Sequence, residues 1–464
     1  MESQQQSERE TCRLIVFRAD GTKVLVKNTQ AGFVLPSVEI PRRERVAENL
    51  TAALKREWGC DAVSLFTADC SPEDCNSTGD RYEALECWGD GDIRAETTWT
   101  PILSVHANSF LEETDFRTLQ QCLHQLVEKE CDVSSPFARR GWLSGLRDWT
   151  SAVIRPLGLE LRESLRQFNV SPSFNLIRFE TTGPAVWFKA VGEPNLREFP
   201  ITLKLAELFP RFMPEILATR TDWNGWLSRE VDGKNLGEAK DIEAWERATA
   251  DLAKLQIESI SSSESLLPLG AHDLRANSLF SAIDPFFDLV ARLMAQQTKI
   301  PPATLSREEV SLLRVLVDDA LTMLADLRMP TTLGHLDLNP WNVIAATNGC
   351  VFLDWAEAYV GQPFFSFEYL LEHFRRNRVD SAKFESRVVN AYRAAWQEFL
   401  SGDCIKEALA LAPLAAVFAY AFRCDTWRNE DRLRDPKIAG YFRSLARRMN
   451  REALQLERRS SCLS

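Results

Sequence analysis

Four polar side chains within one short stretch could support catalysis. The stretch GHLDLNPWNVIAATNGCVFLDW, residues 334–355, contains His335, Asp337, Asn342 and Asp354. VIAA and CVFLDW have the composition of short strands, and the TNG between them predicts a tight hairpin, because Asn-Gly adopts a positive φ readily. A hairpin would bring the loop before its first strand close to the end of its second strand. We therefore predict an oxygen-rich site there, of the kind that suits a hard cation such as Mg²⁺.

The same stretch resembles the catalytic loop of protein-kinase-like enzymes, in which His-x-Asp is followed by Asn five residues after the Asp. LDWAEAYVGQP is similar to the metal-binding segment of the aminoglycoside phosphotransferase family of small-molecule kinases. The resemblance extends over about residues 150–440 and implies that Asp337 accepts or orients the proton of a substrate hydroxyl. It also implies that Asn342 and Asp354 bind Mg²⁺, whereas His335 has a structural role in the loop.

The resemblance further implies a lysine that contacts the nucleotide phosphates and pairs with a glutamate on the next helix. Lys189 lies near the end of VWFKAV, which alternates as a half-buried strand does. Glu198, in the helical segment LREFPITLKLAELFP, is the expected partner, and Glu207 in the same segment is the second candidate.

The adenine and the phosphates need two further elements. WLSREVDG resembles the hinge of kinase-like enzymes, where backbone groups of Ser228, Glu230 and Val231 would bind the adenine. The segment FNLIRFETTGPAVWF contains only Gly183, where protein kinases have several glycines over the phosphates. We expect ATP as the phosphate donor, and this departure leaves GTP open.

The N-terminal 135 residues predict a separate α/β domain. LPSVEIPRRERVAENLTAALKREWGC resembles the signature box of Nudix hydrolases, which hold Mg²⁺ against a pyrophosphate with carboxylates of one helix. Ala53 and Arg56 stand where two of the three metal-binding carboxylates are expected, which leaves Glu44 and Glu57. We therefore expect a catalytically degenerate Nudix-like domain that binds a ligand, mediates dimerisation or helps to position the substrate.

Composition narrows the partners and the compartment. The chain has 464 residues, of which 45% are hydrophobic and 26% charged, as in a globular protein of more than one domain. A net charge of −11 without a long Lys/Arg run argues against nucleic acid and anionic membranes as partners. The apolar run 408–422 contains Pro413 and is too short for a membrane span, and the polar N-terminus does not resemble a signal peptide. We expect a cytoplasmic protein.

The cysteines do not predict a metal site. Eleven are present, none in a CxxC pair, and no His lies close in sequence to a Cys pair. Cys70 and Cys75 flank a loop-like segment and could form a disulfide, although free thiols are expected in a reducing compartment.

Together these patterns predict an α+β protein: a two-lobed protein-kinase-like fold preceded by a small α/β Nudix-like domain. The expected boundaries are 1–135 for the Nudix-like domain, 136–149 for a linker and helix, 150–235 for the small lobe and 236–464 for the helical lobe. The expected function is ATP- and Mg²⁺-dependent transfer of the γ-phosphate to a hydroxyl of a small molecule that is aminoglycoside-, aminoalcohol- or sugar-like. The alternatives are a non-catalytic pseudokinase that binds a nucleotide or another ligand and, less favoured, a Nudix-type pyrophosphohydrolase. The sequence does not indicate the acceptor or the oligomeric state.

Overall fold

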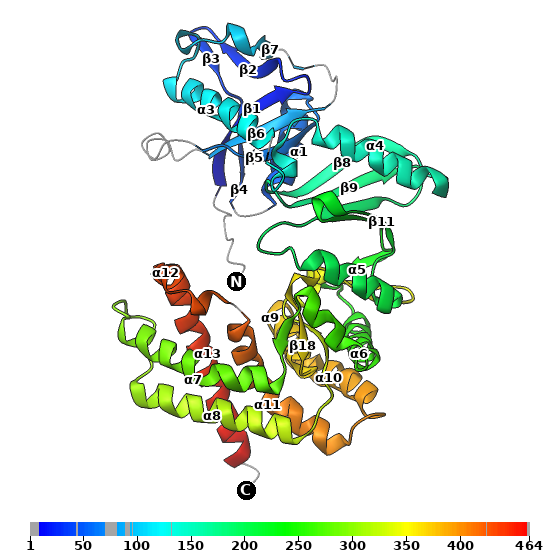
Figure 1. Ribbon diagram of the computed structural model, residues 1–464, viewed down its shortest axis with the longest axis vertical. Helices are drawn as coiled ribbons and strands as arrows, with labels where there is room; N and C mark the ends of the chain where they lie inside the picture. The colour runs from blue at the N-terminus through cyan, green and yellow to red at the C-terminus, as the bar shows by residue number, and fades with distance from the viewer. Residues whose placement is uncertain are drawn as a thin grey trace. The chain divides into compact units, whose positions relative to one another are not determined.

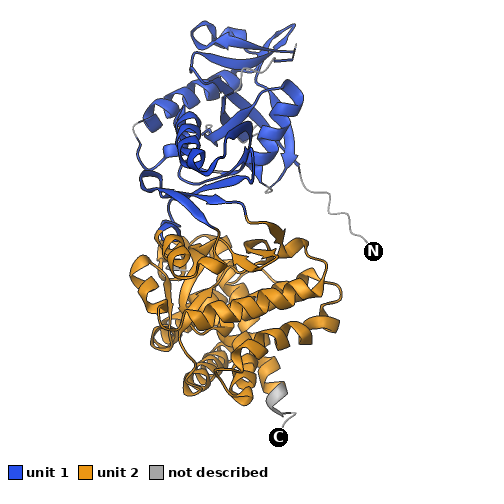
Figure 2. Cartoon of the chain, turned by 90° about the vertical axis from the view of Figure 1, so that its right-hand side faces the viewer, with its two compact units in different colours: residues 1–199, 215–230 blue, residues 200–214, 231–464 orange. Residues whose placement is uncertain are grey.

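The computed structural model forms two compact units, shown in Figure 2: residues 1–199 with 215–230, and residues 200–214 with 231–464. It describes residues 9–42, 45–69, 81–88, 93–94, 96–130, 132–423 and 425–461. Glu44, Cys70 and Cys75 lie outside the described residues, so the expectations that concern them stay predictions.

A mixed sheet of seven strands begins the first unit (Figure 1). Its main order is β3-β2-β1-β6-β5, with β4 also paired to β1 and β7 to β2, and only β1 and β6 run parallel. The strands are β1 Arg9–Arg18, β2 Lys23–Thr29, β3 Gly32–Val34, β4 Ser37–Pro41, β5 Ala62–Thr67, β6 Arg81–Cys87 and β7 Thr97–Pro101.

Strand β1 is buried on both of its faces, because a helix packs on each side of the sheet. Leu14 and Val16 share a core with α1 (Val46–Trp58), whereas Ile15 and Phe17 share another with α3 (Glu113–Glu130). Alternate residues of a strand point to opposite faces, which accounts for the two sets. The predicted helix after residue 44 is confirmed in α1, which ends at Gly59 with φ 74°.

A second, antiparallel sheet completes the first unit. Its order is β11-β12-β10-β9-β8, and α4 (Trp142–Ile154) precedes it in the chain. Strands β9 and β10 alternate between buried and half-buried residues, as VWFKAV predicted. The strands are β8 Leu161–Val170, β9 Asn175–Thr181, β10 Val186–Ala190, β11 Ile216–Arg220 and β12 Gly225–Arg229.

The two sheets of the first unit share a core and a polar contact. The buried Gln167 of β8 accepts a hydrogen bond from the backbone N–H of Ser64 in β5 (2.8 Å) and donates one to its carbonyl (3.1 Å). Phe137 is fully buried against Trp142 and Phe188, with ring centroids 5.3 and 6.2 Å away. Phe137, in the segment 136–149 that the sequence assigns to a linker and helix, is therefore part of a hydrophobic core, and the predicted domain boundaries stay predictions.

The second unit is mostly helical and has one large core. Its helices are most of α5 (Glu198–Leu208), then α6 Ile242–Glu258, α7 Ala276–Ala295, α8 Arg307–Asp326, α9 Phe364–Asn377, α10 Ser381–Trp396, α11 Gly402–Phe422, α12 Glu430–Leu433 and α13 Pro436–Ser461. Two three-stranded sheets are inserted among them, ordered β13-β16-β17 and β14-β18-β15. Their strands are β13 Gly233–Asn235, β14 His272–Leu274, β15 Thr332–His335, β16 Val343–Ala346, β17 Gly349–Phe352 and β18 Ala358–Gly361. Helices α7 and α8 lie side by side (Figure 1).

Helix α11 contains the apolar run noted in the sequence. By length and composition alone it is apolar enough to cross a membrane, and 56% of its most apolar window is buried in the protein. It packs against α8, α9 and α13, and its buried residues include Leu411, Leu414 and Phe418. α11 is longer than the run 408–422 that the sequence analysis judged too short for a membrane span, and it packs into the core, where helices commonly pass the same test of apolarity.

Candidate active site

The predicted hairpin is present and carries two of the candidate residues at its base. β16 and β17 pair antiparallel, with Val343 opposite Phe352 and Ala346 opposite Gly349. Gly349 has φ 131°, a conformation that residues with a side chain rarely adopt. Asn342 directly precedes β16, and Asp354 lies two residues after the end of β17.

The His335 imidazole connects the two ends of the hairpin. Its Nδ1 accepts the backbone N–H of Asp337 (3.1 Å), and its Nε2 lies 3.0 Å from the carbonyl of Leu353. Complete burial lowers the pKa of His335, so the ring stays neutral and can accept at Nδ1 while it donates at Nε2. Both contacts are of the kind that a histidine with a structural role in the loop makes, and that role stays a prediction.

Asn342 is turned toward the catalytic loop by its own amide. Its Nδ2 donates to the backbone carbonyl of Asp337 (2.9 Å), and its backbone carbonyl accepts the backbone N–H of Leu353 (2.8 Å). The side-chain Oδ1 is therefore the atom of Asn342 that could bind a cation. Asp354 is exposed and has φ 63° and ψ 62°, a left-handed conformation that is uncommon outside glycine. Strained backbone of this kind is often found at functional sites.

The side-chain oxygens of Asn342 and Asp354 suit one particular kind of Mg²⁺ site. Among the described residues, no three His, Cys, Asp or Glu side chains form a group that could enclose a metal ion. Asn342 and Asp354 instead offer one amide oxygen and one carboxylate. Mg²⁺ is commonly held by only one or two carboxylates, with phosphates and water as its other ligands. The residues present therefore suit an ion that arrives with a nucleotide.

Hydrogen bonds fix one of the two carboxylate oxygens of Asp337. Oδ1 accepts the Tyr369 hydroxyl at 3.1 Å and the Asn339 Nδ2 at 3.4 Å. Burial and the nearby charge of Asp337 raise the pKa of Tyr369, so its hydroxyl stays protonated and donates. Oδ2 accepts no hydrogen bond from any residue within the described ranges, which leaves it available to a substrate proton.

The Tyr369 ring contacts two further rings. Tyr369 of α9 stacks on Tyr420 of α11 with ring centroids 5.8 Å apart, and His373 lies 5.1 Å from Tyr369 on its own helix. Burial and the charge of Arg376 lower the pKa of His373. No local sequence pattern marks either tyrosine as part of the site.

A half-buried ion cluster lies beside the aromatic stack. The Arg423 guanidinium is 4.3 Å from the Tyr420 ring and pairs with Glu357, which also lies 3.1 Å from His272 Nε2. Burial alone would raise the pKa of Glu357, but the hydrogen bond from His272 and the charge of Arg423 lower it to about 2. Glu357 is therefore ionised at neutral pH.

The predicted lysine–glutamate pair is present in the first unit. Lys189 Nζ lies 2.5 Å from Glu198 Oε1, and the two side chains are only 14% and 2% exposed. The ammonium is also 5.8 Å from the centroid of the Trp226 ring. Glu207 is exposed and pairs with Lys204 instead, which decides between the two candidates.

The residues of the predicted hinge are partly engaged by the protein itself. Ser228 is buried in β12, and the backbone N–H of Glu230 donates to the carbonyl of Ala185 at 3.0 Å. The Glu230 carboxylate accepts two hydrogen bonds from Arg178, at 2.7 and 3.0 Å, which lowers its pKa. Adenine binding at Glu230 and Val231 stays a prediction. Because the Glu230 N–H already donates to Ala185, only the backbone carbonyl of Glu230 could bind an adenine.

The segment that contains the loop matches a known protein family. Residues 269–400 match the phosphotransferase enzyme family. The matched segment contains both β16 and β17, and it confirms the prediction that the chain is a phosphotransferase. The match begins after the predicted Nudix-like domain, which stays a prediction. No curated protein matches the chain.

Several solved structures resemble the chain weakly. A choline kinase from Streptococcus pneumoniae is 14% identical, with a TM-score of 0.43, over 67% of this chain and 99% of that one. A macrolide 2'-phosphotransferase from Brachybacterium faecium is 17% identical, with a TM-score of 0.38, over 62% and 98%. A spectinomycin phosphotransferase is 10% identical, with a TM-score of 0.39, over 67% and 98%. Likeness at this level does not establish a shared substrate.

Proposed function

We propose that this phosphotransferase transfers the γ-phosphate of ATP, in the presence of Mg²⁺, to a hydroxyl of a small molecule. The observation that carries the proposal is the hydrogen-bonded loop in which His335 and Asn342 hold the backbone of Asp337. This loop lies inside the segment that matches the phosphotransferase family. A carboxylate whose backbone is fixed on both sides, and which has one oxygen available, suits the acceptor side of phosphoryl transfer.

The proposed reaction needs one proton transfer and one displacement at phosphorus. Asp337 Oδ2 takes the proton of the acceptor hydroxyl as that oxygen bonds to the γ-phosphorus. The bond from the γ-phosphorus to its bridging oxygen breaks, and ADP leaves. Tyr369 acts through its hydrogen bond to Oδ1 and keeps the carboxylate oriented, so it is a positioning residue.

The remaining residues have roles on the nucleotide side. Asn342 Oδ1 and the Asp354 carboxylate would hold Mg²⁺, which when bound offsets negative charge on the phosphates. The Lys189 ammonium would bind the same phosphates, and Glu198 would keep it in place. Phosphoryl transfer depends mainly on such positioning and charge stabilisation.

The acceptor class stays the one expected from the resemblance, an aminoglycoside-, aminoalcohol- or sugar-like compound. The stacked tyrosines lie beside Asp337, and the Arg423 guanidinium already lies over the Tyr420 ring. The stack therefore does not select among these three classes.

A turnover screen tests the proposal. ADP release from ATP is measured with the full chain against aminoglycosides, aminoalcohols and sugars, with Mg²⁺ and with excess EDTA. We expect Mg²⁺-dependent turnover that requires at least one acceptor and yields its phosphate ester. Tight, Mg²⁺-independent binding of ATP without turnover on any acceptor would instead favour the pseudokinase alternative.

A further inference from the structure

Glu357 contacts the loop of Asp337 through its backbone and the end of α11 through its side chain. Its backbone carbonyl accepts the N–H of Leu336, the residue directly before Asp337, at 3.0 Å. Its carboxylate pairs with Arg423, which directly follows α11, and lies 3.1 Å from His272 Nε2. Glu357 therefore joins two parts of the second unit that are far apart in the sequence.

The side chains beyond Arg423 lead back to Asp337. The Arg423 guanidinium lies 4.3 Å from the centroid of the Tyr420 ring, and this ring stacks on Tyr369 with 26° between the ring planes. Tyr369 then donates its hydroxyl to Asp337 Oδ1. These contacts close on themselves, and we call the residues that make them the Asp337 network: Leu336, Asp337, Glu357, Tyr369, Tyr420 and Arg423.

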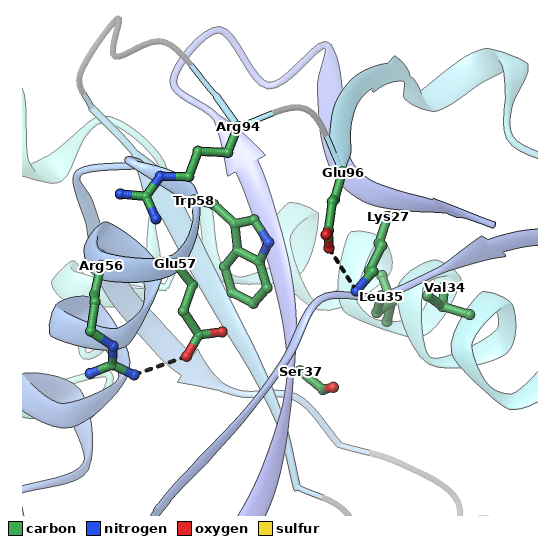
Figure 3. Close-up of a pocket in the computed structure, with 9 residues that line it drawn as sticks. All are labelled: Lys27, Val34, Leu35, Ser37, Arg56, Glu57, Trp58, Arg94 and Glu96. Carbon is green, nitrogen blue, oxygen red and sulfur yellow. Dashed lines mark hydrogen bonds and ion pairs between the residues drawn. The ribbon is translucent and has the colours of Figure 1, made fainter.

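The ion pair in the Asp337 network is better shielded from water than the exposed pairs of the chain. The side chains of Arg423 and Glu357 are 16% and 23% exposed. Those of Lys27 and Glu96, a pair in the first unit drawn in Figure 3, are 42% and 72% exposed. Water and salt screen an exposed pair, so its loss changes little. Loss of one partner from a shielded pair leaves the other charge uncompensated, and the surrounding side chains must adjust.

The surroundings of Glu357 separate it from the Mg²⁺ ligands expected nearby in the sequence. It lies three residues after Asp354, the expected carboxylate ligand. Its own carboxylate already faces Arg423 and His272. The positive charge of the arginine disfavours a second cation at the same carboxylate. Glu357 is therefore better suited to hold other side chains in place than to bind a metal ion.

We propose that Glu357 is a positioning residue for phosphoryl transfer, which acts through Arg423 and Tyr420 to hold the Tyr369 hydroxyl against Asp337. This inference rests on the proposed function, which assigns the acceptor proton to Asp337. A carboxylate fixed through both its backbone and its side chain keeps one orientation, and small errors in orientation cost a large part of the rate. Loss of Glu357 should therefore lower kcat and leave the binding of ATP unchanged.

Steady-state turnover of Glu357→Gln, Tyr369→Phe and the double variant tests this role. The glutamine keeps the backbone bond to Leu336 and removes the charge opposite Arg423. The kcat of Glu357→Gln should fall about tenfold, while KM for ATP and the Mg²⁺ concentration that gives half of the maximal rate stay unchanged. Because Glu357 acts through Tyr369, the double variant should stay within about twofold of Tyr369→Phe.

A control variant and a second network variant accompany these measurements. Glu385→Gln is the matched control, because Glu385 also forms a half-buried ion pair, with Arg375 at 2.8 Å, and lies outside the Asp337 network. It should leave kcat unchanged. If Glu357→Gln does not fold, Arg423→Lys takes its place, since lysine keeps the charge but lacks the planar guanidinium over Tyr420. Its kcat should also fall while KM for ATP stays unchanged.

Three results with an active wild-type protein would overturn the proposal. The first is an unchanged kcat in Glu357→Gln. The second is a double variant about tenfold slower than Tyr369→Phe, because independent losses multiply. The third is a higher Mg²⁺ requirement in Glu357→Gln, which would place this carboxylate with the metal ligands.

A measurement without substrates separates this inference from the proposed function. A wild-type protein that phosphorylates no acceptor would refute the proposed function but not the contacts of the Asp337 network. With 3-fluorotyrosine in place of Tyr369, the fluorine NMR resonance reports the surroundings of this ring. The resonance should move in Glu357→Gln and stay in place in Glu385→Gln. An unmoved resonance in Glu357→Gln would show that Glu357 does not hold Tyr369.

Discussion

Replacement of Glu198 by Gln should lower kcat/KM for ATP. The size of the expected fall follows from the hydrogen bond between Glu198 and Lys189. The Glu198 Oε1 lies 2.5 Å from Lys189 Nζ, and both side chains are largely shielded from solvent. Hydrogen bonds that involve charged groups contribute roughly 1.5–3 kcal/mol, and the uncharged Gln amide would keep only part of this with the Lys189 ammonium. A loss of about 1–2 kcal/mol corresponds to about a five- to thirtyfold fall in kcat/KM for ATP.

The assay is steady-state turnover with ATP as the varied substrate and an accepted acceptor in excess. Because Glu198 acts through Lys189, kcat/KM for ATP should fall while KM for the acceptor stays unchanged. Glu207→Gln is the matched control on the same helix, since Glu207 is 66% exposed and its ion-pair partner is Lys204. We expect this control to stay within about twofold of wild type. Equal behaviour of the two variants would refute the positioning role of the buried pair.

Three further changes test other parts of the account. Tyr369→Phe removes a hydrogen bond to the charged Asp337, so kcat should fall about ten- to hundredfold in steady-state assays while KM for ATP is unchanged. Phe137→Ala should lower the free energy of unfolding by about 3–5 kcal/mol in denaturant titrations, because this ring fills the core shared by two sheets. Burial raises the pKa of Glu86 to about 7, so its contribution to stability is complete below the unfolded value of 4.5 and is lost as pH rises through 7. Glu86→Gln cannot ionise and still accepts the Gly141 N–H, so it should gain about 3 kcal/mol over wild type at pH values above 7 in thermal melts.

Matched controls separate these effects from general damage. Tyr441→Phe, at a partly exposed tyrosine of α13, should leave kcat unchanged. Phe399→Ala, at a side chain that is 56% exposed, should change the free energy of unfolding by less than about 0.5 kcal/mol. A Glu86→Gln variant whose melting temperature follows that of wild type from pH 4 to pH 8 would show that Glu86 does not titrate in this range.

The parts of the site that the sequence predicted are those encoded locally. The hairpin could be predicted because apolar runs flank an Asn-Gly turn, and Glu198 because it begins the helix after the Lys189 strand. The stack of Tyr369 on Tyr420 depends on the packing of α9 against α11, which no local pattern records. The place of Asp337 before the hairpin was therefore predictable from sequence, whereas its hydrogen-bond donor Tyr369 was not.

The errors in the fold have a similar origin. The segment around Phe137 has the polar, irregular composition of a linker, yet the shared core of two sheets buries it. Strand β8 was missed because LRESLRQFNV is rich in charged residues and lies at the edge of its sheet, where one side is not paired with a strand of that sheet. Long-range burial decided both cases, and composition alone does not reveal it.

The most direct test compares ATP binding with phosphoryl transfer in Asp337→Asn. Transfer from radiolabelled ATP to an accepted acceptor is followed in a single turnover, and ATP affinity is measured by calorimetry on the same preparation. Asp326→Asn, at an exposed position that ends α8, is the control. We predict a loss of transfer of about a hundredfold or more with ATP affinity unchanged. Full transfer by Asp337→Asn would contradict the role of this carboxylate.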